Sequence, residues 1–404
     1  MIDVCDSRIG MMVGLAIGDA MGAPIEFTSP REPEDYVTSY LTGGAHNVSL
    51  GEFTDDTSMA LAMADAFLTS KTFDPHLIMD NFLKWRNEGA YSPRGVMFDC
   101  GNTVASALMR YENDKSNPFA GSTDPLSAGN GGLMRLAPAI LAACELDEAV
   151  RFAARSTRLT HGADEAIFYS ELLAEELWNQ EPNKRFAETK HPLDIARNEV
   201  MSGGYVRETY QAAWWAFQTT DCFEDCIIKA INRGHDTDTT GAVAGMIAGA
   251  MYGYSSIPQW MLDALQWHDE IKNIAKALIE MAEIQRETPR ELLREMRDAL
   301  FSFQQPNAGE IYTIKGRKCL CIHPLANYGG GSATLWAVEG HSAQLTLYRE
   351  QGGYIRGKCI RVSDNPVGIE FQPNRNGWSR HADDKEKRFL KLEEIGRYDT
   401  NWYS

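Results

Sequence analysis

The chain has 404 residues, of which 44% are hydrophobic and 24% charged, and it carries a formal net charge of −17 at pH 7. This composition is that of a globular protein with room for one large and one smaller domain. No run reaches the roughly 18 consecutive apolar residues that a membrane-spanning helix needs, and the first residues lack the basic segment of a signal peptide. We therefore expect no membrane partner and a cytoplasmic location.

The charge is unevenly divided along the chain. Residues 304–404 contain 14 Lys and Arg against 11 Asp and Glu, whereas the preceding residues contain 25 against 45. Because phosphate binding depends on Lys and Arg, the acidic first part is unsuited to general nucleic-acid binding.

The eight cysteines form no CxxC pair, which favours buried thiols over disulfides or a zinc site: Cys5, Cys100, Cys144, Cys222, Cys226, Cys319, Cys321 and Cys359.

Helix signatures follow one another up to about residue 303. They are the runs MALAMADAFL after Ser58, DNFLKW after Met79, VASALMRY after Thr103, LMRLAPAILAA after Gly132, EAIFYSELLAEELW after Asp164 and AVAGMIAGAMYG after Gly241. Some are rich in Ala and Gly and apolar nearly all round, which is typical of central helices packed on every side. Residues 1–303 are therefore predicted to form a compact all-α domain.

The pattern changes after the boundary segment QQPNAG at residues 304–309. Short β-type runs such as SATLWAVE, AQLTLYR and YIRGKCIRV alternate with Gly, Asn and Pro clusters, so residues 304–404 are predicted to form a small β-rich domain. Its aromatic and basic side chains have two interpretations. They form either a core with a solvated surface, or a face that recognises a target or partner.

Two acidic strings, TDDT at residues 54–57 and DTDT at residues 236–239, each precede an apolar helical run. One interpretation is that their Asp and Thr residues cap the helices. The other is a shared metal site, because carboxylates and hydroxyls are the hard oxygen ligands that Mg²⁺ or Mn²⁺ selects. A third acid, Glu26, follows the tight GDAMGAPIE segment. Carboxylates converging on one point would repel unless cations lay among them.

A second chemical signal is GNGGLMR at residues 129–135, after the loop DPLSA. Glycines let backbone amides approach a phosphate closely, and a helix start favours an anion, although such glycines also serve close packing. His161 in TRLTHGADEA and Asp99 in FDCGNTVASAL each have a structural interpretation beside a functional one.

The motifs GLAIGDAMGAPIEF, FTDDTSMALAMADAF, DCGNTVASAL, AGNGGLMRLAPAIL, TRLTHGADEA and INRGHDTDTTGAVAGMIAGAMYG occur in this order. Together they closely resemble the ADP-ribosylglycohydrolase family, over about residues 8–285. The resemblance implies an all-α catalytic domain whose binuclear magnesium centre removes ADP-ribose from modified targets. It does not explain residues 304–404.

Position by position, the resemblance implies these metal ligands: Thr54, Asp55, Asp56, Asp236, Asp238 and Thr239. It implies a cleft for the diphosphate and sugar lined by Ser127, Gly129, Asn130, Gly131, Gly132, Met134 and His161. Glu26 matches an acid that assists catalysis beside the metals in some relatives, and Asp99 matches an acid near the distal ribose. His235 departs from the family, where Gly or Asp is common, so it bears on substrate preference at the rim of the site.

The expected reaction is hydrolysis of the C1″ glycosidic bond of an ADP-ribosylated acceptor, with ADP-ribosyl-arginine on protein as the foremost candidate. Such cleavage passes through an oxocarbenium-like state and needs a nearby carboxylate and a positioned water. Two Mg²⁺ ions, with Mn²⁺ as the alternative, would hold the ribose and the water, while Asp55 or Asp56, with Glu26, handles proton transfer. The rival functions are a non-catalytic ADP-ribose-binding or immunity protein and a two-metal phosphohydrolase acting on nucleotide diphosphates.

Overall fold

The computed structural model describes residues 3–180 and 196–300 and seven strand segments between residues 311 and 380, with backbone alone for residues 287–300 and for the strands. The chain divides into two compact units, Met1–Glu283 and Ile284–Ser404, and each is described by itself. Within residues 3–180 and 196–300 the structure is helical, with only isolated β-bridges, which confirms the prediction of a helical first part.

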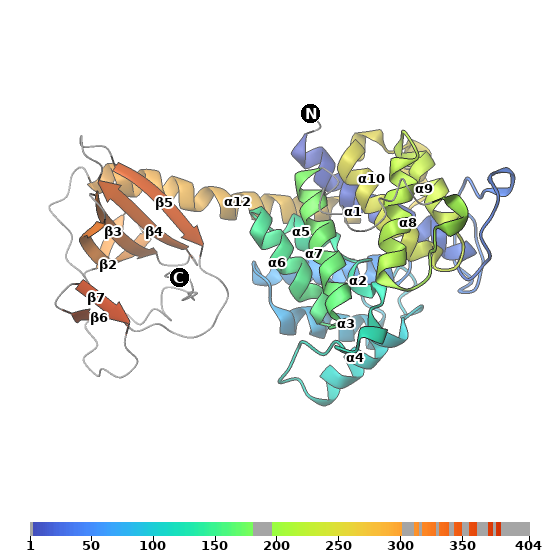
Figure 1. Cartoon of the computed structure of the whole chain (residues 1–404), viewed down its shortest axis with the longest axis horizontal. Helices are drawn as coiled ribbons and strands as arrows, with labels where there is room; N and C mark the ends of the chain where they lie inside the picture. The colour runs from blue at the N-terminus through green and yellow to red at the C-terminus, as the bar shows by residue number, and fades with distance from the viewer. Residues whose placement is uncertain are drawn as a thin grey trace. The chain divides into compact units, whose positions relative to one another are not determined.

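The centre of the first unit is the helix pair α1 (Val4–Gly22) and α10 (Thr237–Tyr252), which lie side by side in Figure 1. The two backbones touch through glycines. A Cβ atom at Gly18 would lie 1.9 Å from the carbonyl oxygen of Gly241, and one at Gly22 would lie 2.5 Å from the Cα of Asp238. Since no side chain separates the helices there, they pack closer than helices with larger residues can. This contact brings the end of α1 to the start of α10.

Further helices pack around this pair, and together with the first part of α12, up to residue 281, they complete the buried apolar core. Their bounds are α2 (Asp55–Ser70), α3 (Pro75–Glu88), α4 (Asn102–Asn113), α5 (Ala137–Leu141), α6 (Leu146–Arg158), α7 (Asp164–Asn179), α8 (Val206–Gln218), α9 (Phe223–Ile231), α11 (Gln259–Ala264) and α12 (His268–Leu300). The outer helix α6 is amphipathic: Phe152 is buried, whereas Arg151 and Arg155 are partly exposed. The central pair, in contrast, is buried nearly all round.

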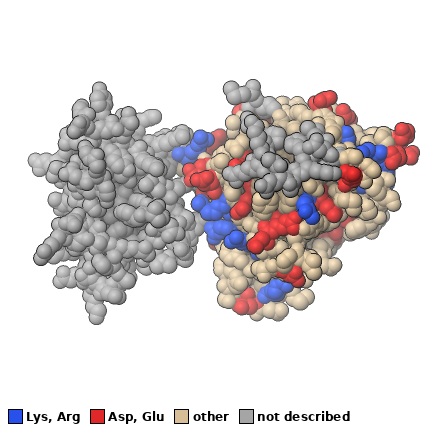
Figure 2. All heavy atoms as spheres, in the orientation of Figure 1, with Lys and Arg blue, Asp and Glu red and all other residues tan. Residues whose placement is uncertain are grey.

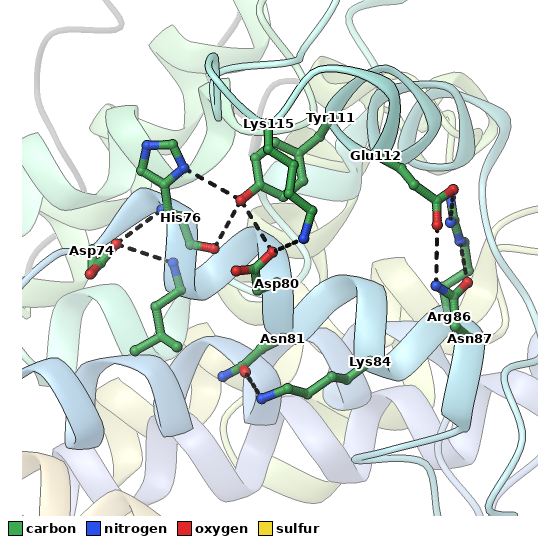
Figure 3. Close-up of polar contacts among 11 residues, drawn as sticks. Asp74, His76, Asp80, Asn81, Lys84, Arg86, Asn87, Tyr111, Glu112 and Lys115 are labelled. Atoms are coloured by element: carbon green, nitrogen blue, oxygen red, sulfur yellow. Dashed lines mark hydrogen bonds and ion pairs between the residues drawn. The ribbon is translucent and has the colours of Figure 1, made fainter.

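Polar contacts fix α4 against α3 (Figure 3). The Tyr111 hydroxyl donates to Oδ1 of Asp80 over 3.2 Å, and Nη2 of Arg86 donates to Oε2 of Glu112 over 2.6 Å. These contacts join the last turn of α4 to α3.

The segment after Gly132 differs from the helix that the sequence predicts. Asn130–Gly132 forms a single 3₁₀ turn, and the α-helix begins only at Ala137, with Pro138 in its first turn, and ends at Leu141. Proline fits the first turn of a helix because it has no amide hydrogen to donate, but it cannot occupy a helix interior without loss. The glycine loop therefore leads into a turn rather than a long helix.

Within Ile284–Ser404, backbone pairing forms an antiparallel sheet in the order β1-β2-β3-β4-β5 and a separate pair β6-β7. The strands are β1 (Ile311–Ile314), β2 (Arg317–Tyr328), β3 (Gly331–Val338), β4 (Ala343–Arg349), β5 (Ile355–Arg361), β6 (Phe371–Asn374) and β7 (Gly377–Arg380). The register between β2 and β3 shifts twice, between Cys321 and Ala326. The expected boundary segment at residues 304–309 lies outside the described residues.

The five cysteines whose side chains are described are free thiols, as predicted, but the predicted burial holds for only two of them. Cys144 and Cys226 are buried and the other three are at least partly exposed; Cys319, Cys321 and Cys359 lie outside the described side chains.

In the part of the chain that the structure describes, no helix is long and apolar enough to span a membrane. Acidic and basic side chains are intermixed on the face of the first unit that Figure 2 shows.

Candidate functional site

The two acidic strings meet in space although they lie far apart in the chain. The Thr54 hydroxyl oxygen is 3.3 Å from Oδ2 of Asp56 and 3.3 Å from Oδ2 of Asp238, which is 184 residues away. Thr54 and Asp236 are the N-cap residues of α2 and α10, yet neither side chain makes a capping hydrogen bond. The side chains are thus directed to the space between the helices rather than to their own backbones.

Asp19 of α1 supplies the missing cap of α2. It accepts hydrogen bonds from the backbone amides of Thr54 and Thr57, over 2.9 and 3.0 Å, and from their hydroxyls, over 2.8 and 2.6 Å. Burial raises the pKa of Asp19 to about 6, against the lowering effect of these hydrogen bonds. Sequence reasoning missed this residue; its only local signal is an acid inside the small-residue segment IGDAMG.

Carboxylates that are buried, except for the half-buried Asp236, form two groups around the ends of α1, α2 and α10, and Asp238 belongs to both. Asp19, Asp56 and Asp238 form one group and Glu26, Asp236 and Asp238 the other, with one oxygen of each residue within 4.8 Å of the others. The Oδ1 atoms of Asp56 and Asp238 are buried without a hydrogen-bond partner among the described residues. Oxygens in this state fit a hard divalent cation.

The electrostatics of this cluster are unfavourable without a cation. Burial, followed by the charge of neighbouring acids, raises the pKa of Asp55, Asp56 and Asp238 well above its usual range. Burial also raises the pKa of Asp236, although hydrogen bonds from Asn130 and Thr239 oppose the rise. Thr239 itself is buried at the first turn of α10. Of the six residues expected as metal ligands, Thr54, Asp56 and Asp238 are thus in direct contact, and Asp236 belongs to the same carboxylate group as Asp238.

Asn130 ties the glycine loop to the second acidic string. Its side-chain amide donates to Oδ2 of Asp236 over 2.8 Å and to the hydroxyl of Thr209 over 2.8 Å. Its backbone amide donates to the carbonyl of Gly204 over 3.1 Å, and that of Gly129 donates to the carbonyl of Ser127 over 2.8 Å. The amides of Gly129 and Asn130 are therefore used by carbonyls within the protein, whereas Gly131 and Gly132 belong to the 3₁₀ turn that follows.

The ring of His161 lies against this loop. A Cβ atom at Gly131 would be 2.6 Å from Cε1 of His161, so only glycine leaves room for the ring. Nδ1 of His161 is 2.8 Å from the Thr160 hydroxyl. Burial, followed by the positive charge of Arg135, lowers the pKa of His161 to about 3. The imidazole is consequently neutral at pH 7 and acts through hydrogen bonding rather than charge.

Arg135 is a buried cation beneath the loop that sequence reasoning did not single out. Its guanidinium donates to the carbonyl of Gly131 and, over 2.6 Å, to the hydroxyl of Thr160. Its Cζ atom lies 4.9 Å from the ring centre of Phe82. Burial lowers its pKa to about 10, while Asp55 and Asp56 act to raise it. The signal for it was the arginine that closes GNGGLMR, in an otherwise apolar stretch.

Two further residues of the expected cleft have different surroundings. Met134 is buried, with its backbone amide donating to the carbonyl of Asn130 over 3.1 Å. Ser127 is half-buried, and its hydroxyl donates to the carbonyl of Asp124 over 2.6 Å. Ser127 thus uses its donor to shape its own loop.

Glu26 and Asp99 lie on either side of a histidine that sequence reasoning missed. Nε2 of His46 is 2.9 Å from Oε2 of Glu26 and 3.5 Å from Oδ2 of Asp99. Burial, followed by the charges of Asp99 and Asp236, raises the pKa of Glu26 to about 9. Without a bound cation, Glu26 therefore favours its protonated form at neutral pH.

His235 joins the rim of the site through its backbone. Its amide donates to the carbonyl of Thr28 over 2.8 Å and its carbonyl accepts from the amide of Phe27 over 2.7 Å, while its side chain is exposed. Its φ of 59° is in the left-handed region, which Gly and Asp tolerate better than most residues. A left-handed backbone at this position would suit glycine or aspartate as well as histidine.

Comparison with known proteins identifies the family of the chain. The ADP-ribosylglycohydrolase family model matches residues 2–288. The ADP-ribosylarginine hydrolase Tri1 of Serratia proteamaculans is 36% identical over 295 residues, which cover 69% of this chain and 80% of that protein. The ADP-ribosyl-[dinitrogen reductase] glycohydrolase of Rhodospirillum rubrum is 32% identical over 298 residues, which cover 69% of this chain and 97% of that protein.

A solved structure described as an ADP-ribosylglycohydrolase-related protein complex aligns with a TM-score of 0.59 at 37% sequence identity. The alignment covers 69% of this chain and 98% of that one. Sequence, fold and buried acidic cluster thus agree. The chain belongs to the ADP-ribosylglycohydrolase family of glycosidic-bond hydrolases.

Proposed function

We propose that this protein is a Mg²⁺-dependent hydrolase that removes ADP-ribose from ADP-ribosylated proteins, with ADP-ribosyl-arginine as its principal substrate. The observation that carries the proposal is the convergence of Thr54, Asp56 and Asp238, with two buried carboxylate oxygens that have no partner in the described protein. The arginine linkage is supported by relatives from Serratia proteamaculans and Pseudomonas putida that are named ADP-ribosylarginine hydrolases.

The proposed ligands of two Mg²⁺ ions, with Mn²⁺ as the alternative, are Thr54, Asp55, Asp56, Asp236, Asp238 and Thr239. When bound, these cations would offset the carboxylate charge and polarise the hydroxyls of the distal ribose. The donor set contains only carboxylates and hydroxyls, which magnesium prefers to the nitrogen and sulfur ligands of zinc.

The remaining chemistry belongs to the acids at the edge of this cluster. Hydrolysis of a glycosidic bond needs a proton for the leaving group and a base for the attacking water. Glu26, which lies beside Asp236 and Asp238 and contacts His46, is the proposed proton donor, and Asp55 or Asp56 is the proposed base. Asp99 faces the same space and is proposed to contact the distal ribose.

The diphosphate is proposed to lie along the glycine loop, away from the carboxylates. The amides of Gly131 and Gly132 would donate to its oxygens, with the neutral His161 as a further donor. Arg135 lies behind the loop and offsets the diphosphate charge from below. Ser127, Gly129, Asn130 and Met134 shape the loop, and His235 borders the acceptor side.

Residues 304–404 are proposed to be a β-rich domain that recognises the modified protein. The support is indirect: the family model ends at residue 288, and the net charge of the chain changes sign after residue 303. A chain that ends at residue 303 should therefore keep its activity on a small ADP-ribosyl-arginine substrate and lose activity on modified protein.

The decisive experiment compares the intact protein with its Asp55→Ala variant on arginine-ADP-ribosylated protein in the presence of Mg²⁺. Release of free ADP-ribose should fall by at least about 10²- to 10³-fold, because a preorganised charged group is lost from the reacting centre. Asp221→Ala, which removes an exposed acid, serves as the matched control.

Three results would contradict the proposal. Turnover by Asp55→Ala at the rate of the intact protein removes the role of the acidic cluster. Release of AMP or phosphate points instead to a phosphohydrolase. Binding of ADP-ribose without any turnover by the intact protein points to a binding or immunity protein.

A further inference from the structure

A tight turn at residues 43–48 carries His46 to the edge of the site. The amides and carbonyls of Gly43 and Val48 pair with each other, each over 2.8 Å, and close the turn. Gly43, Gly44 and Asn47 all have positive φ, at 95°, 71° and 50°. A closed turn of this kind gives the histidine backbone a fixed place, because few other conformations satisfy both hydrogen bonds.

Arg94 anchors this turn from another segment of the chain. Its Nη1 donates to the carbonyl of His46 over 3.1 Å. Its Nε and Nη2 bind both oxygens of Glu52, over 2.9 and 2.6 Å, and Glu52 also accepts from the amide of Ser49 over 2.7 Å. The guanidinium lies 3.8 Å from the ring centre of Phe98. A bidentate pair with a stacked arginine has a defined geometry, unlike a single surface ion pair.

The His46 side chain then connects two acids from distant segments. One imidazole nitrogen contacts both Glu26 and Asp99, and the ring centre lies 5.9 Å from that of Phe27 and 6.0 Å from that of Phe98. The side chain is only 19% exposed. Asp99 has a φ of 47°, so its backbone is also in the left-handed region. The carboxyl groups of Glu26 and Asp99 come from separate segments, so a side chain that contacts both fixes their orientation relative to each other.

We infer that His46 is a positioning residue that aligns Glu26 with Asp99, and that Arg94 acts on the reaction through His46. The inference rests on the proposed function, in which these two acids face the leaving group and the ribose. Catalytic groups must be held within about 0.5 Å of their productive places, which requires supporting hydrogen bonds. His46 supplies such a bond to Glu26, over 2.9 Å, and its same nitrogen lies 3.5 Å from Asp99.

The first test measures kcat and KM of His46→Ala on arginine-ADP-ribosylated protein. Loss of a supporting hydrogen bond should lower kcat by about 10- to 100-fold and leave the affinity for the product ADP-ribose and the thermal midpoint unchanged. His46→Gln, whose side-chain amide can still bridge the two acids, should recover most of the lost kcat. Wild-type kcat in His46→Ala overturns the inference, and so does a His46→Gln variant as impaired as His46→Ala.

The second test is a double-mutant cycle. Arg94→Ala should lower kcat by itself but have no further effect when His46 is already alanine, because the arginine acts through that residue. Arg86→Ala is the matched control, since Arg86 also binds a glutamate, Glu112, over 2.6 Å but lies between α3 and α4 (Figure 3). Full additivity of the Arg94 and His46 effects contradicts the inference.

Asp55→Ala, assayed in the same series, separates the two proposals. If Asp55→Ala is inactive and His46→Ala is fully active, the inference fails while the proposed function stands. If Asp55→Ala is also fully active, the proposed function fails and the inference fails with it.

Discussion

The site has an acidic end, around Asp56 and Asp238, and a loop end, around Gly131 and His161. Buried negative groups crowd the first, whereas a buried positive group lies beneath the second. At the acidic end, Asp56 and Asp238 have buried oxygens without partners, and their pKa values are raised. At the loop end, Arg135 donates to Gly131, and His161 is neutral. The charged and titratable side chains of the loop end therefore have partners within the protein, whereas the acidic end has buried carboxylate oxygens that a cation would satisfy.

The largest expected effect is a pH-dependent stability that appears only without Mg²⁺. The pKa of Asp19 rises from 3.8 to about 6 and that of Glu26 from 4.5 to about 9 on folding. At a pH between the unfolded and the folded pKa of each acid, the folded protein binds more protons than the unfolded one. The free energy of unfolding should therefore fall as pH rises from about 4 to about 9. Bound Mg²⁺ favours the ionised acids and should flatten this slope. Thermal unfolding with chelator and with Mg²⁺ measures both.

Asp56→Asn sharpens this test because it removes one charge at nearly constant volume. In chelator at pH 8 the variant should melt above the intact protein, and it should gain less from Mg²⁺. Equal midpoints for both proteins, with and without the metal, would show that the acidic end needs no cation.

A smaller effect is expected from Gly131→Ala at the loop end. The new methyl group would displace the His161 ring, which should cost about 1 to 3 kcal/mol of stability and weaken ADP-ribose binding. The response to Mg²⁺ should stay unchanged, because the acidic end is not touched. Gly101→Ala is the control, since a Cβ atom there meets no atom within 4 Å. Calorimetric titration with ADP-ribose and thermal unfolding distinguish the two variants.

The smallest effect is expected from His235→Gly. Glycine adopts the left-handed backbone without steric cost but loses more entropy on folding, so the two contributions nearly cancel. Stability should change by no more than about 1 kcal/mol. A loss well beyond this in denaturant unfolding would mean that the imidazole, and not only the backbone, holds the rim.

Helix positions in the first unit were predictable because apolar periodicity is local. The run after Ser58 is part of α2, and the all-round apolar run after Gly241 is part of α10, which is buried as its pattern suggests. The run after Gly132 was not, since Pro138 delays the helix to Ala137. Periodicity alone does not weigh one proline against a long apolar stretch.

The parts of the site that depend on distant contacts were harder to foresee. The strings at Thr54 and Asp236 were recognisable from their mirrored composition. Asp19, His46 and Arg135, by contrast, acquire their places only through partners elsewhere in the chain. No spacing rule connects a histidine in a glycine turn with acids 20 and 53 residues away.

The glycine contact between α1 and α10 determines which substitutions can alter the acidic cluster. The spacing between Asp19 and Asp238 is set by two main chains in direct contact, at Gly18 with Gly241 and at Gly22 with Asp238. Side-chain substitutions in the surrounding core can be absorbed by neighbouring rotamers without altering that spacing. A single methyl group at Gly18 cannot, because no rotamer moves a carbonyl oxygen. The spacing of the two carboxylates is thus set where the helix backbones touch without any side chain between them.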